Sequence, residues 1–301
     1  MKIYIAYPIL EQPYGGANQF LRALKNKFVE NNVYTKEPSQ SDVILFNGHH
    51  EVNLVHHLKN KFPNKKFVHR TDGLQKLYNK PDDKRQDITF EVNRLFADAT
   101  IFQTQWALDK HIEYGMKITS LNEVILNSVN DKIFNQIEKK QKNNKVKLVC
   151  TSWSTNKNKG FETYKFLDEN LDFNKYSFDF VGNDPGIKYN NINMLGPHST
   201  KEVASFLRNS DIFITSTKHD CCSNSLLEAL FSGLPCVALN SGGNTEIVKK
   251  GGILYNSTNE IIESIEQVSN NINMYKANIQ VETIDQISEK YINFFRKVLN
   301  V

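Results

Sequence analysis

The sequence predicts an α/β protein made of two doubly wound domains, each with a parallel sheet. Short apolar runs alternate with segments of helical periodicity almost to the end of the chain. The runs are continuously apolar, which is typical of parallel strands that are covered on both faces. A polar stretch rich in Lys and Asn at 136–145 interrupts the alternation, which then restarts. The 301 residues are enough for two domains, which we predict at 1–140 and 141–281.

The first domain is expected to alternate strands with amphipathic helices. Its predicted strands are 3–7, 43–46, 67–69, 100–103 and 124–126, and its predicted helices are 18–30, 52–61, 88–96 and 106–114.

The second domain repeats this pattern. Its predicted strands are 147–151, 177–181, 212–215, 236–239 and 253–255, and its predicted helices are 161–171, 201–208, 225–231 and 260–269. A last helix follows from about residue 282, with a stripe of apolar residues that must be buried.

Charge and composition exclude several classes of protein. The 37 basic and 33 acidic residues are spread along the chain, which argues against a dedicated nucleic-acid binder. The net charge of +4 is compatible with weak peripheral contact with an anionic membrane. No apolar run reaches the roughly 18–20 residues that span a bilayer. The four Cys form no metal-binding spacing, so we expect them to be reduced thiols. We expect the protein to be cytoplasmic, either in solution or at the inner face of a membrane.

The most informative segment is 219–230, between two predicted strands. Ser223, Asn224 and Ser225 are helix-capping residues, so a helix should begin there. Its free backbone N–H groups would form an anion site at the carboxyl end of a strand. Glu228, about one turn further on, is placed to accept hydrogen bonds from a ribose. The alternative is an ordinary capped helix with a solvated Glu.

Two glycine pairs allow close approach of a ligand to the backbone. Gly15 and Gly16 open the first predicted helix, and Gly242 and Gly243 follow a strand of the second domain. Each pair is also compatible with a plain strand-to-helix turn. Neither lies in a G-x-G-x-x-G or a Walker A pattern, so a nicotinamide cofactor is not expected.

Two further segments follow predicted strands. Lys157 and Lys159 precede Gly160, and Lys159 would reach a phosphate as a point charge. The alternative is a solvated Lys. In the first domain, His69 and Asp72 follow a strand and are candidates for substrate contact, against the alternative of a turn with a satisfied His.

Two histidine clusters raise the question of a metal. They are His49-His50-Glu51 and His56-His57, and neither matches H-E-x-x-H. A D-x-D pattern is also lacking. We therefore expect no metal site and no cofactor.

Together these segments resemble the retaining glycosyltransferases of family 4, also called glycosyl transferases group 1. The resemblance is carried mainly by 225–230, 233–238, 242–243 and 246–248, with 15–16, 127–130 and 159–160 in the expected order. It implies the GT-B fold, in which two Rossmann-like domains face each other across a cleft and a last helix, here 282–301, crosses back to the first domain. The sequence departs from the family at Asp220, where the pattern has Glu, and near Ser154, where an Arg is usual.

The resemblance also implies an activity: transfer of a sugar from a nucleotide-diphosphate sugar, such as a UDP-sugar or GDP-sugar, to an acceptor hydroxyl with retention. The acceptor would be a glycan, a lipid-linked molecule or a small molecule. Asp220 would contact the sugar, Lys159 the diphosphate, and His69 or Asp72 the sugar or acceptor. Two alternatives stay open: a nucleotide-sugar epimerase of the same fold and a non-catalytic sugar-nucleotide binder.

Overall fold

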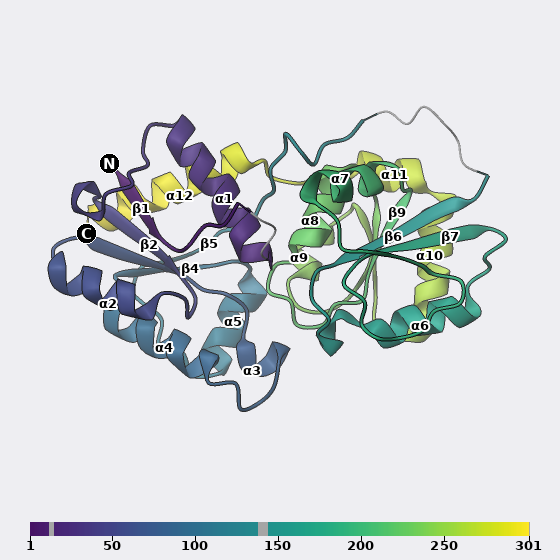
Figure 1. Cartoon of the computed structure of the whole chain (residues 1–301), viewed down its shortest axis with the longest axis horizontal. Coiled ribbons are helices and arrows are strands. Elements are labelled where there is room, and N and C mark those ends of the chain that lie inside the picture. Colours follow the sequence, from purple (N-terminus) through teal and green to yellow (C-terminus); the bar gives the residue numbers. More distant parts are fainter. Residues whose placement is uncertain (12–14, 138–143, 301) are drawn as a thin grey trace. The chain divides into compact units, whose positions relative to one another are not determined.

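The computed structural model describes residues 1–11, 15–137 and 144–300, which form two compact units (Figure 1). Unit 1 contains Met1–Ser128 and Glu282–Val301, and unit 2 contains Val129–Val281. The boundary predicted at residue 140 lies outside the described residues, and in the structure unit 2 begins at Val129 and ends at Val281.

Unit 1 has a parallel five-stranded sheet in the order β1-β2-β3-β4-β5. Its strands are β1 (Ile3–Ala6), β2 (Val43–Asn47), β3 (Lys66–Arg70), β4 (Ala99–Phe102) and β5 (Asn122–Val124). Ile3 also forms a parallel bridge with Tyr34, on the edge of β1 opposite β2. After β1 the chain first adds a parallel segment at Tyr34 on one side of β1, and then adds β2 on the other side. The direction in which strands are added to the sheet therefore reverses between β1 and β2.

Helices cover both faces of this sheet. The helices of unit 1 are α1 (Gly15–Glu30), α2 (Val52–Lys61), α3 (Gln75–Tyr78), α4 (Arg85–Phe96), α5 (Gln105–Glu113) and α12 (Ile284–Leu299). Residues of α1 and α12 share one buried cluster with Ile5 and Leu45, whereas α2 and α4 contribute to a second cluster with Ile44 and Phe46. Neighbouring residues of β2 thus face opposite sides, as expected for a doubly wound sheet.

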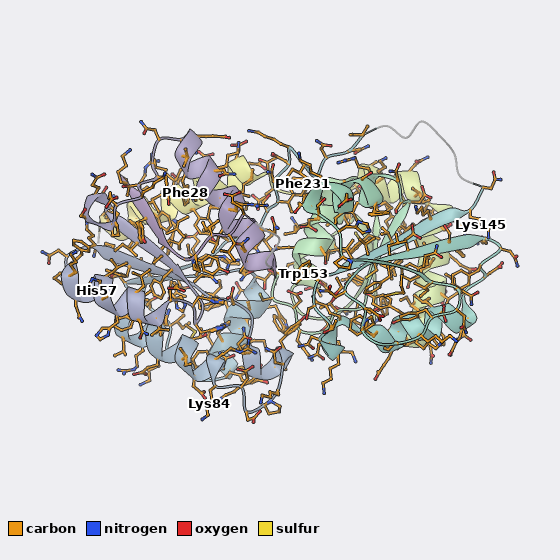
Figure 2. The ribbon with its side chains drawn as sticks, viewed as in Figure 1. Phe28, His57, Lys84, Lys145, Trp153 and Phe231 are labelled. Atoms are coloured by element: carbon orange, nitrogen blue, oxygen red, sulfur yellow. The ribbon has the colours of Figure 1, made fainter. Side chains whose placement is uncertain are left out.

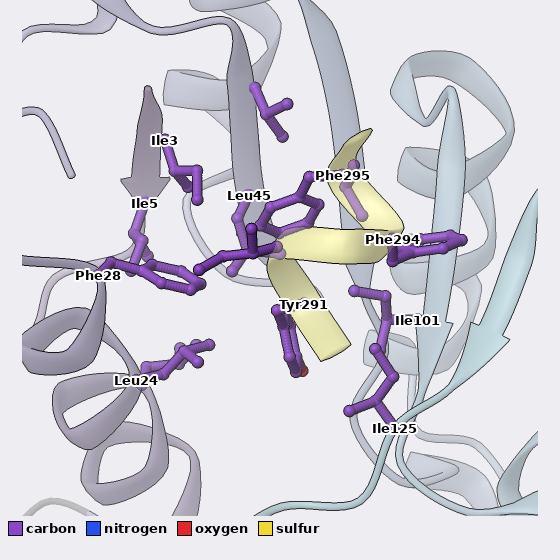
Figure 3. Packing of buried hydrophobic residues seen from close by; sticks show 14 of the residues in the cluster. Ile3, Ile5, Leu24, Phe28, Leu45, Ile101, Ile125, Tyr291, Phe294 and Phe295 are labelled. Carbon is purple, nitrogen blue, oxygen red and sulfur yellow. The ribbon is translucent and has the colours of Figure 1, made fainter. Parts of the chain in front are cut away.

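The last helix, α12, is a core element of unit 1. A capping box between Thr283 and Gln286 begins the helix. Tyr291 and Phe295 are fully buried and pack against Phe28 of α1 with ring centroids 6.5 and 6.2 Å apart (Figure 3). The apolar stripe expected from the sequence is therefore buried against α1 and the sheet.

Unit 2 has a parallel six-stranded sheet in the order β11-β10-β9-β6-β7-β8. The first strand, β6, lies between β9 and β7. The chain adds β7 and β8 on one side of β6 and then β9, β10 and β11 on the other, so the direction of strand addition reverses between β6 and β9. The strands are β6 (Val146–Ser152), β7 (Tyr176–Gly182), β8 (Asn193–Gly196), β9 (Ile212–Thr215), β10 (Cys236–Leu239) and β11 (Gly252–Tyr255). The helices are α6 (Phe161–Asn170), α7 (Thr200–Arg208), α8 (Asn224–Phe231), α9 (Asn244–Val248), α10 (Ile261–Asn270) and α11 (Ile272–Ala277).

The predicted fold class, two parallel-sheet α/β domains, is confirmed. The sequence missed β8, α3 and α11, all of which are short. Among the described residues, no helix combines the length and apolar character needed to cross a bilayer.

Replacing Phe295 by Ala should destabilise unit 1 strongly, because the aromatic ring is fully buried between α12 and α1. We expect a loss of about 3–5 kcal/mol in its free energy of unfolding. The chain has two Trp, Trp106 in unit 1 and Trp153 in unit 2, so Trp106 fluorescence in a Trp153→Phe background reports urea unfolding of unit 1 alone. Leu95→Ala, at a side chain 50% exposed, is the control and should change stability by less than about 0.5 kcal/mol. Equal losses in both variants would contradict this packing.

Candidate functional site

Two predicted catalytic residues, Lys159 and Asp220, form an ion pair at the edge of the second sheet. Lys159 Nζ lies 3.3 Å from Asp220 Oδ2, and the two side chains are 15% and 19% exposed. Lys159 follows β6 and Asp220 follows β9, the two neighbouring strands between which the chain direction reverses. In open α/β sheets, the crevice at such a reversal is where ligands bind.

Close backbone packing places Lys159. Gly160 has a positive φ of +78°, and a Cβ there would lie 2.4 Å from the carbonyl oxygen of Ser216, just after β9. Lys218 N donates to the carbonyl oxygen of Asn158 at 2.7 Å. The segment after β6 is therefore held against the segment after β9, and only glycine fits at position 160.

A second glycine allows the same close approach at Asp220. Gly242 has φ +64°, and a Cβ there would lie 2.3 Å from the carbonyl oxygen of Asp220. The next residue, Gly243, donates its N–H to that oxygen at 2.8 Å. Asp220 Oδ1 also accepts the N–H of Cys222 at 3.2 Å. The carboxylate is thus fixed by its neighbours, and Oδ2 points to Lys159.

Helix α8 begins directly after this segment, as the capping residues predicted. Ser223 is buried, and its Oγ accepts the N–H of Leu226 at 3.4 Å. Ser225 Oγ lies 3.1 Å from Ser223 Oγ. Asn224 is the first residue of the helix. The positive end of the α8 dipole therefore lies beside the Lys159–Asp220 pair.

Glu228 lies on the second turn of α8, and burial raises the pKa of its carboxyl group to about 8. Among the described residues, its carboxylate has no hydrogen bond or ion pair that would offset this burial. A carboxyl group with a pKa near neutrality is a candidate functional group.

The other predicted donor-binding residues lie at element ends. Lys157 is exposed at the start of the 3₁₀ turn Lys157–Lys159. Gly15 begins α1 with φ +67° and has open space where a Cβ would be, and Gly16 follows it with an exposed surface. That the two domains face each other across a cleft stays a prediction, and so do the roles of Lys157, Gly15 and Gly16.

In unit 1, a network of polar side chains connects the carboxyl ends of several strands. Arg70 at the end of β3 is fully buried, and its guanidinium donates to Asn47 Oδ1, to Asp72 Oδ1 at 3.3 Å and to Asn127 Oδ1 at 2.7 Å. Asn47 Nδ2 also donates to Asp72 Oδ2 at 2.9 Å. Asp72, a predicted site residue, is therefore held in place at the sheet edge with 18% of its side chain exposed.

The structure corrects the prediction for His69, which is a core residue. Its side chain is fully buried and stacks on Phe46 at 4.5 Å. Its ring nitrogens contact the carbonyl oxygen of Gly48 at 3.0 Å and Asn93 Nδ2 at 2.9 Å. Burial lowers the pKa of His69 to about 3, so the ring is neutral. A side chain enclosed in this way cannot contact a sugar or an acceptor.

His50 was not among the predicted site residues, although it lies where His69 was expected to act. Its Nε2 is 3.7 Å from Asp72 Oδ2, and its ring meets Tyr7 edge-on at 5.3 Å. Tyr7 follows β1 and His50 follows β2, and the bridge of Ile3 to Tyr34 places the change of direction in the first sheet between these two strands. The signal available in the sequence was its position, just past the end of an apolar run instead of within one.

Comparison with known proteins bears on the fold and the family resemblance. Residues 133–271 match the model of a family described as Glycosyl transferases group 1. Comparison with the curated proteins finds no match. Sucrose-phosphate synthase from Thermosynechococcus elongatus is similar with a TM-score of 0.79 and 12% identity over 99% of this chain and 98% of that one. HepE from Anabaena, solved with UDP, gives a TM-score of 0.73 and 14% identity over 99% and 100%.

The fold is GT-B. The pneumococcal O-GlcNAc transferase GtfA, solved with UDP and GlcNAc, is also similar, with a TM-score of 0.66 and 16% identity over 96% of this chain and 61% of that one. The resemblance to glycosyl transferases group 1 is confirmed over residues 133–271, which hold Lys159, Asp220 and all of α8. In this GT-B chain, membership of family 4 and the retaining mechanism stay predictions.

Replacing Glu228 by Gln should stabilise the protein at alkaline pH. The folded-state pKa of about 8 lies above the ordinary value of 4.5, so Glu228 lowers stability as the pH rises from about 4.5 through 8. Gln has no proton to lose. We expect the melting temperature of Glu228→Gln to match that of the wild type near pH 4.5 and to exceed it at pH 8.5 by at least about 2–4 °C. Glu263→Gln, at an exposed position of α10, is the control. A difference that is independent of pH would contradict the assignment.

Proposed function

We propose that the chain is a retaining glycosyltransferase that moves a sugar from a UDP-sugar or GDP-sugar to an acceptor hydroxyl in glycan or surface polysaccharide synthesis. The observation that carries this proposal is the Lys159–Asp220 pair at the strand reversal of unit 2, directly before the start of α8. The match of residues 133–271 to glycosyl transferases group 1 supports it. The UDP in the HepE and GtfA structures favours a uridine donor.

The chemistry requires positive charge near the diphosphate. As the bond to the sugar breaks, negative charge develops on the leaving diphosphate and positive charge on the sugar ring. The ammonium group of Lys159 would turn partly from Asp220 to the diphosphate and stabilise its negative charge. Lys157 and the N–H groups at the start of α8 would also contact the diphosphate. These groups supply the charge without a metal ion at the diphosphate. Asp220 would then face the sugar and stabilise the developing ring charge.

Glu228 would bind the ribose of the donor. Two ribose hydroxyls are hydrogen-bond donors, and an ionised carboxylate offers two acceptor oxygens. The carboxylate of Glu228 lacks another partner among the described residues, and burial holds its pKa at about 8. Because the ionised form accepts both bonds, nucleotide binding would shift its ionisation toward the carboxylate.

Unit 1 would supply the acceptor side. Asp72 is held by Asn47 and Arg70, and His50 lies beside it. Both side chains are partly exposed at the carboxyl edge of the sheet and are suited to hydrogen bonding with sugar hydroxyls. We propose Gly15 and Gly16 as backbone contacts to the donor.

The assay that tests this function begins with a melting-temperature screen against UDP, GDP and their sugars. A ligand at about 100 times its dissociation constant should stabilise the protein by roughly 2.7 kcal/mol. The best sugar nucleotide is then incubated without acceptor and the products are analysed. Slow release of nucleoside diphosphate supports a transferase, and an epimerised sugar nucleotide shows an epimerase. Binding without any turnover across an acceptor panel would indicate a non-catalytic binder.

Replacing Lys159 by Ala should lower turnover far more than stability. Loss of one charged contact to the leaving diphosphate is expected to reduce kcat by about 10²–10³-fold. The melting temperature should fall less than turnover, because Asp220 keeps the N–H of Cys222 as a hydrogen-bond donor. Nucleoside diphosphate release and thermal unfolding measure the two effects. Lys201→Ala, at an exposed position of α7, is the control. Parallel losses of turnover and stability would contradict the catalytic role.

The affinity for UDP-glucose should rise between pH 6 and pH 9 in the wild type, since ionised Glu228 binds the ribose better than the protonated acid does. In Glu228→Gln the affinity should be about 10–100-fold weaker than that of the wild type at pH 9 and independent of pH. Calorimetric titration with UDP-glucose measures both, because its phosphates do not titrate in this range. Unchanged affinity in the variant would exclude the ribose contact.

A further inference from the structure

Three side chains that bind metals in many proteins converge at the strand reversal of unit 1. His49 and His50 follow β2, and Asp72 follows β3. One nitrogen of each imidazole and one oxygen of the carboxylate lie within 4.8 Å of one another. We propose that His49, His50 and Asp72 bind one divalent transition-metal ion of the zinc type.

The carboxylate is already oriented for this role. Asp72 Oδ2 lies 3.7 Å from His50 Nε2 and accepts a hydrogen bond from Asn47 Nδ2 at 2.9 Å. Asp72 Oδ1 accepts one from Arg70. Outer hydrogen bonds of this kind hold the ligands of metal sites in a fixed direction. Gly48 leaves the necessary space, because a Cβ at its position would lie 2.6 Å from Asp72 Oδ2.

The two imidazoles provide a second indication of a ligand. The rings of His49 and His50 stack with centroids 4.3 Å apart, and one nitrogen of each lies within 4.8 Å of the other and of an Asp72 oxygen. His49 Nδ1 is buried and has no hydrogen-bond partner among the described residues. A buried nitrogen without a partner destabilises a fold. Coordination of an ion by Nδ1 itself would offset that cost.

The donor set selects the class of metal. Two imidazole nitrogens and one carboxylate suit Zn²⁺, Co²⁺ or Fe²⁺, whereas Mg²⁺ and Ca²⁺ prefer oxygen ligands. Zinc bonds of about 2.0–2.2 Å require the ligand atoms to move about 1 Å closer together. The His50 side chain is 35% exposed and has room for this movement. Three protein ligands leave a position for water or a substrate oxygen.

The residues of this ion site differ from those proposed to bind the donor diphosphate, which are Lys159, Lys157 and the start of α8. An ion beside Asp72 would place a Lewis acid on the proposed acceptor side, where its open position takes a hydroxyl oxygen. That last role rests on the proposed function, whereas metal binding does not.

Metal binding can be tested on the full-length, untagged protein after removal of metals with a chelator. Co²⁺ titration followed by visible absorption, and Zn²⁺ titration by calorimetry, should each show one equivalent bound. His50→Gln and Asp72→Asn should each weaken binding at least tenfold. The matched control is His56→Gln combined with His57→Gln, an adjacent and exposed pair on α2 (His57 is labelled in Figure 2), which should bind like the wild type. The four Cys are buried and do not compete.

Wild-type affinity no stronger than that of His50→Gln, or affinity lost in the His56/His57 control instead, would overturn the metal site. Circular dichroism shows whether each variant is folded, and the melting shift with UDP, whose proposed charged contacts are in unit 2, shows whether it still binds nucleotide. A protein that binds UDP but not Co²⁺ or Zn²⁺ would refute the ion site and leave the proposed function standing. A protein that binds the metal but no nucleotide would refute the proposed function alone.

Discussion

The candidate site of unit 2 depends on close backbone packing between the segments that leave β6 and β9. These strands are neighbours, but the chain extends the sheet in opposite directions from them. The segment leaving β6 packs against the segment leaving β9 at Gly160, and the segment leaving β10 packs against it at Gly242. A side chain at either glycine would collide with the backbone of Ser216 or Asp220. This packing brings Lys159 and Asp220 to 3.3 Å although 60 residues separate them in the sequence. Neither charge would reach the other from an isolated strand end.

The same reversal in unit 1 leads to different chemistry. There the strands are β1 and β2, and the groups at their ends are Tyr7 and His50. Unit 1 fixes its site with a buried side-chain network around Arg70, whereas unit 2 uses backbone groups and a helix start. Backbone N–H groups suit an anionic diphosphate, and directed side chains suit hydroxyl groups or an ion.

The sequence predicted the strands well where burial on both faces made them continuously apolar. It missed β8, whose four residues lie at the sheet edge and are mostly half-exposed, so no apolar run marks them. It predicted the start of α8, because capping residues mark that position, and the structure confirms it. Lys159, marked by the adjacent Gly160, and Asp220, taken from the family resemblance, lie 3.3 Å apart, while their roles stay predictions. It failed to distinguish His69 from His50. His69 lies inside β3 and is enclosed on both faces, whereas His50 lies past the end of β2. In a buried parallel strand the residue pattern does not show where the strand ends, so it does not separate a residue inside the strand from one just past its end.

Unit 2 also contains two enclosed or half-buried carboxyl groups, Asp168 and Glu228, whose surroundings differ. Asp168 is fully enclosed on α6, yet it accepts the N–H groups of Asn190, Asn191 and Ile192. Although burial alone would raise its pKa, these bonds hold the pKa of Asp168 below the usual value. Glu228 on α8 is half-buried and has no such donors among the described residues, and burial raises its pKa to about 8. Three N–H donors therefore stabilise the carboxylate of Asp168, whereas no comparable donors among the described residues stabilise that of Glu228. This contrast agrees with our proposal that Glu228 accepts hydrogen bonds from a group of the substrate.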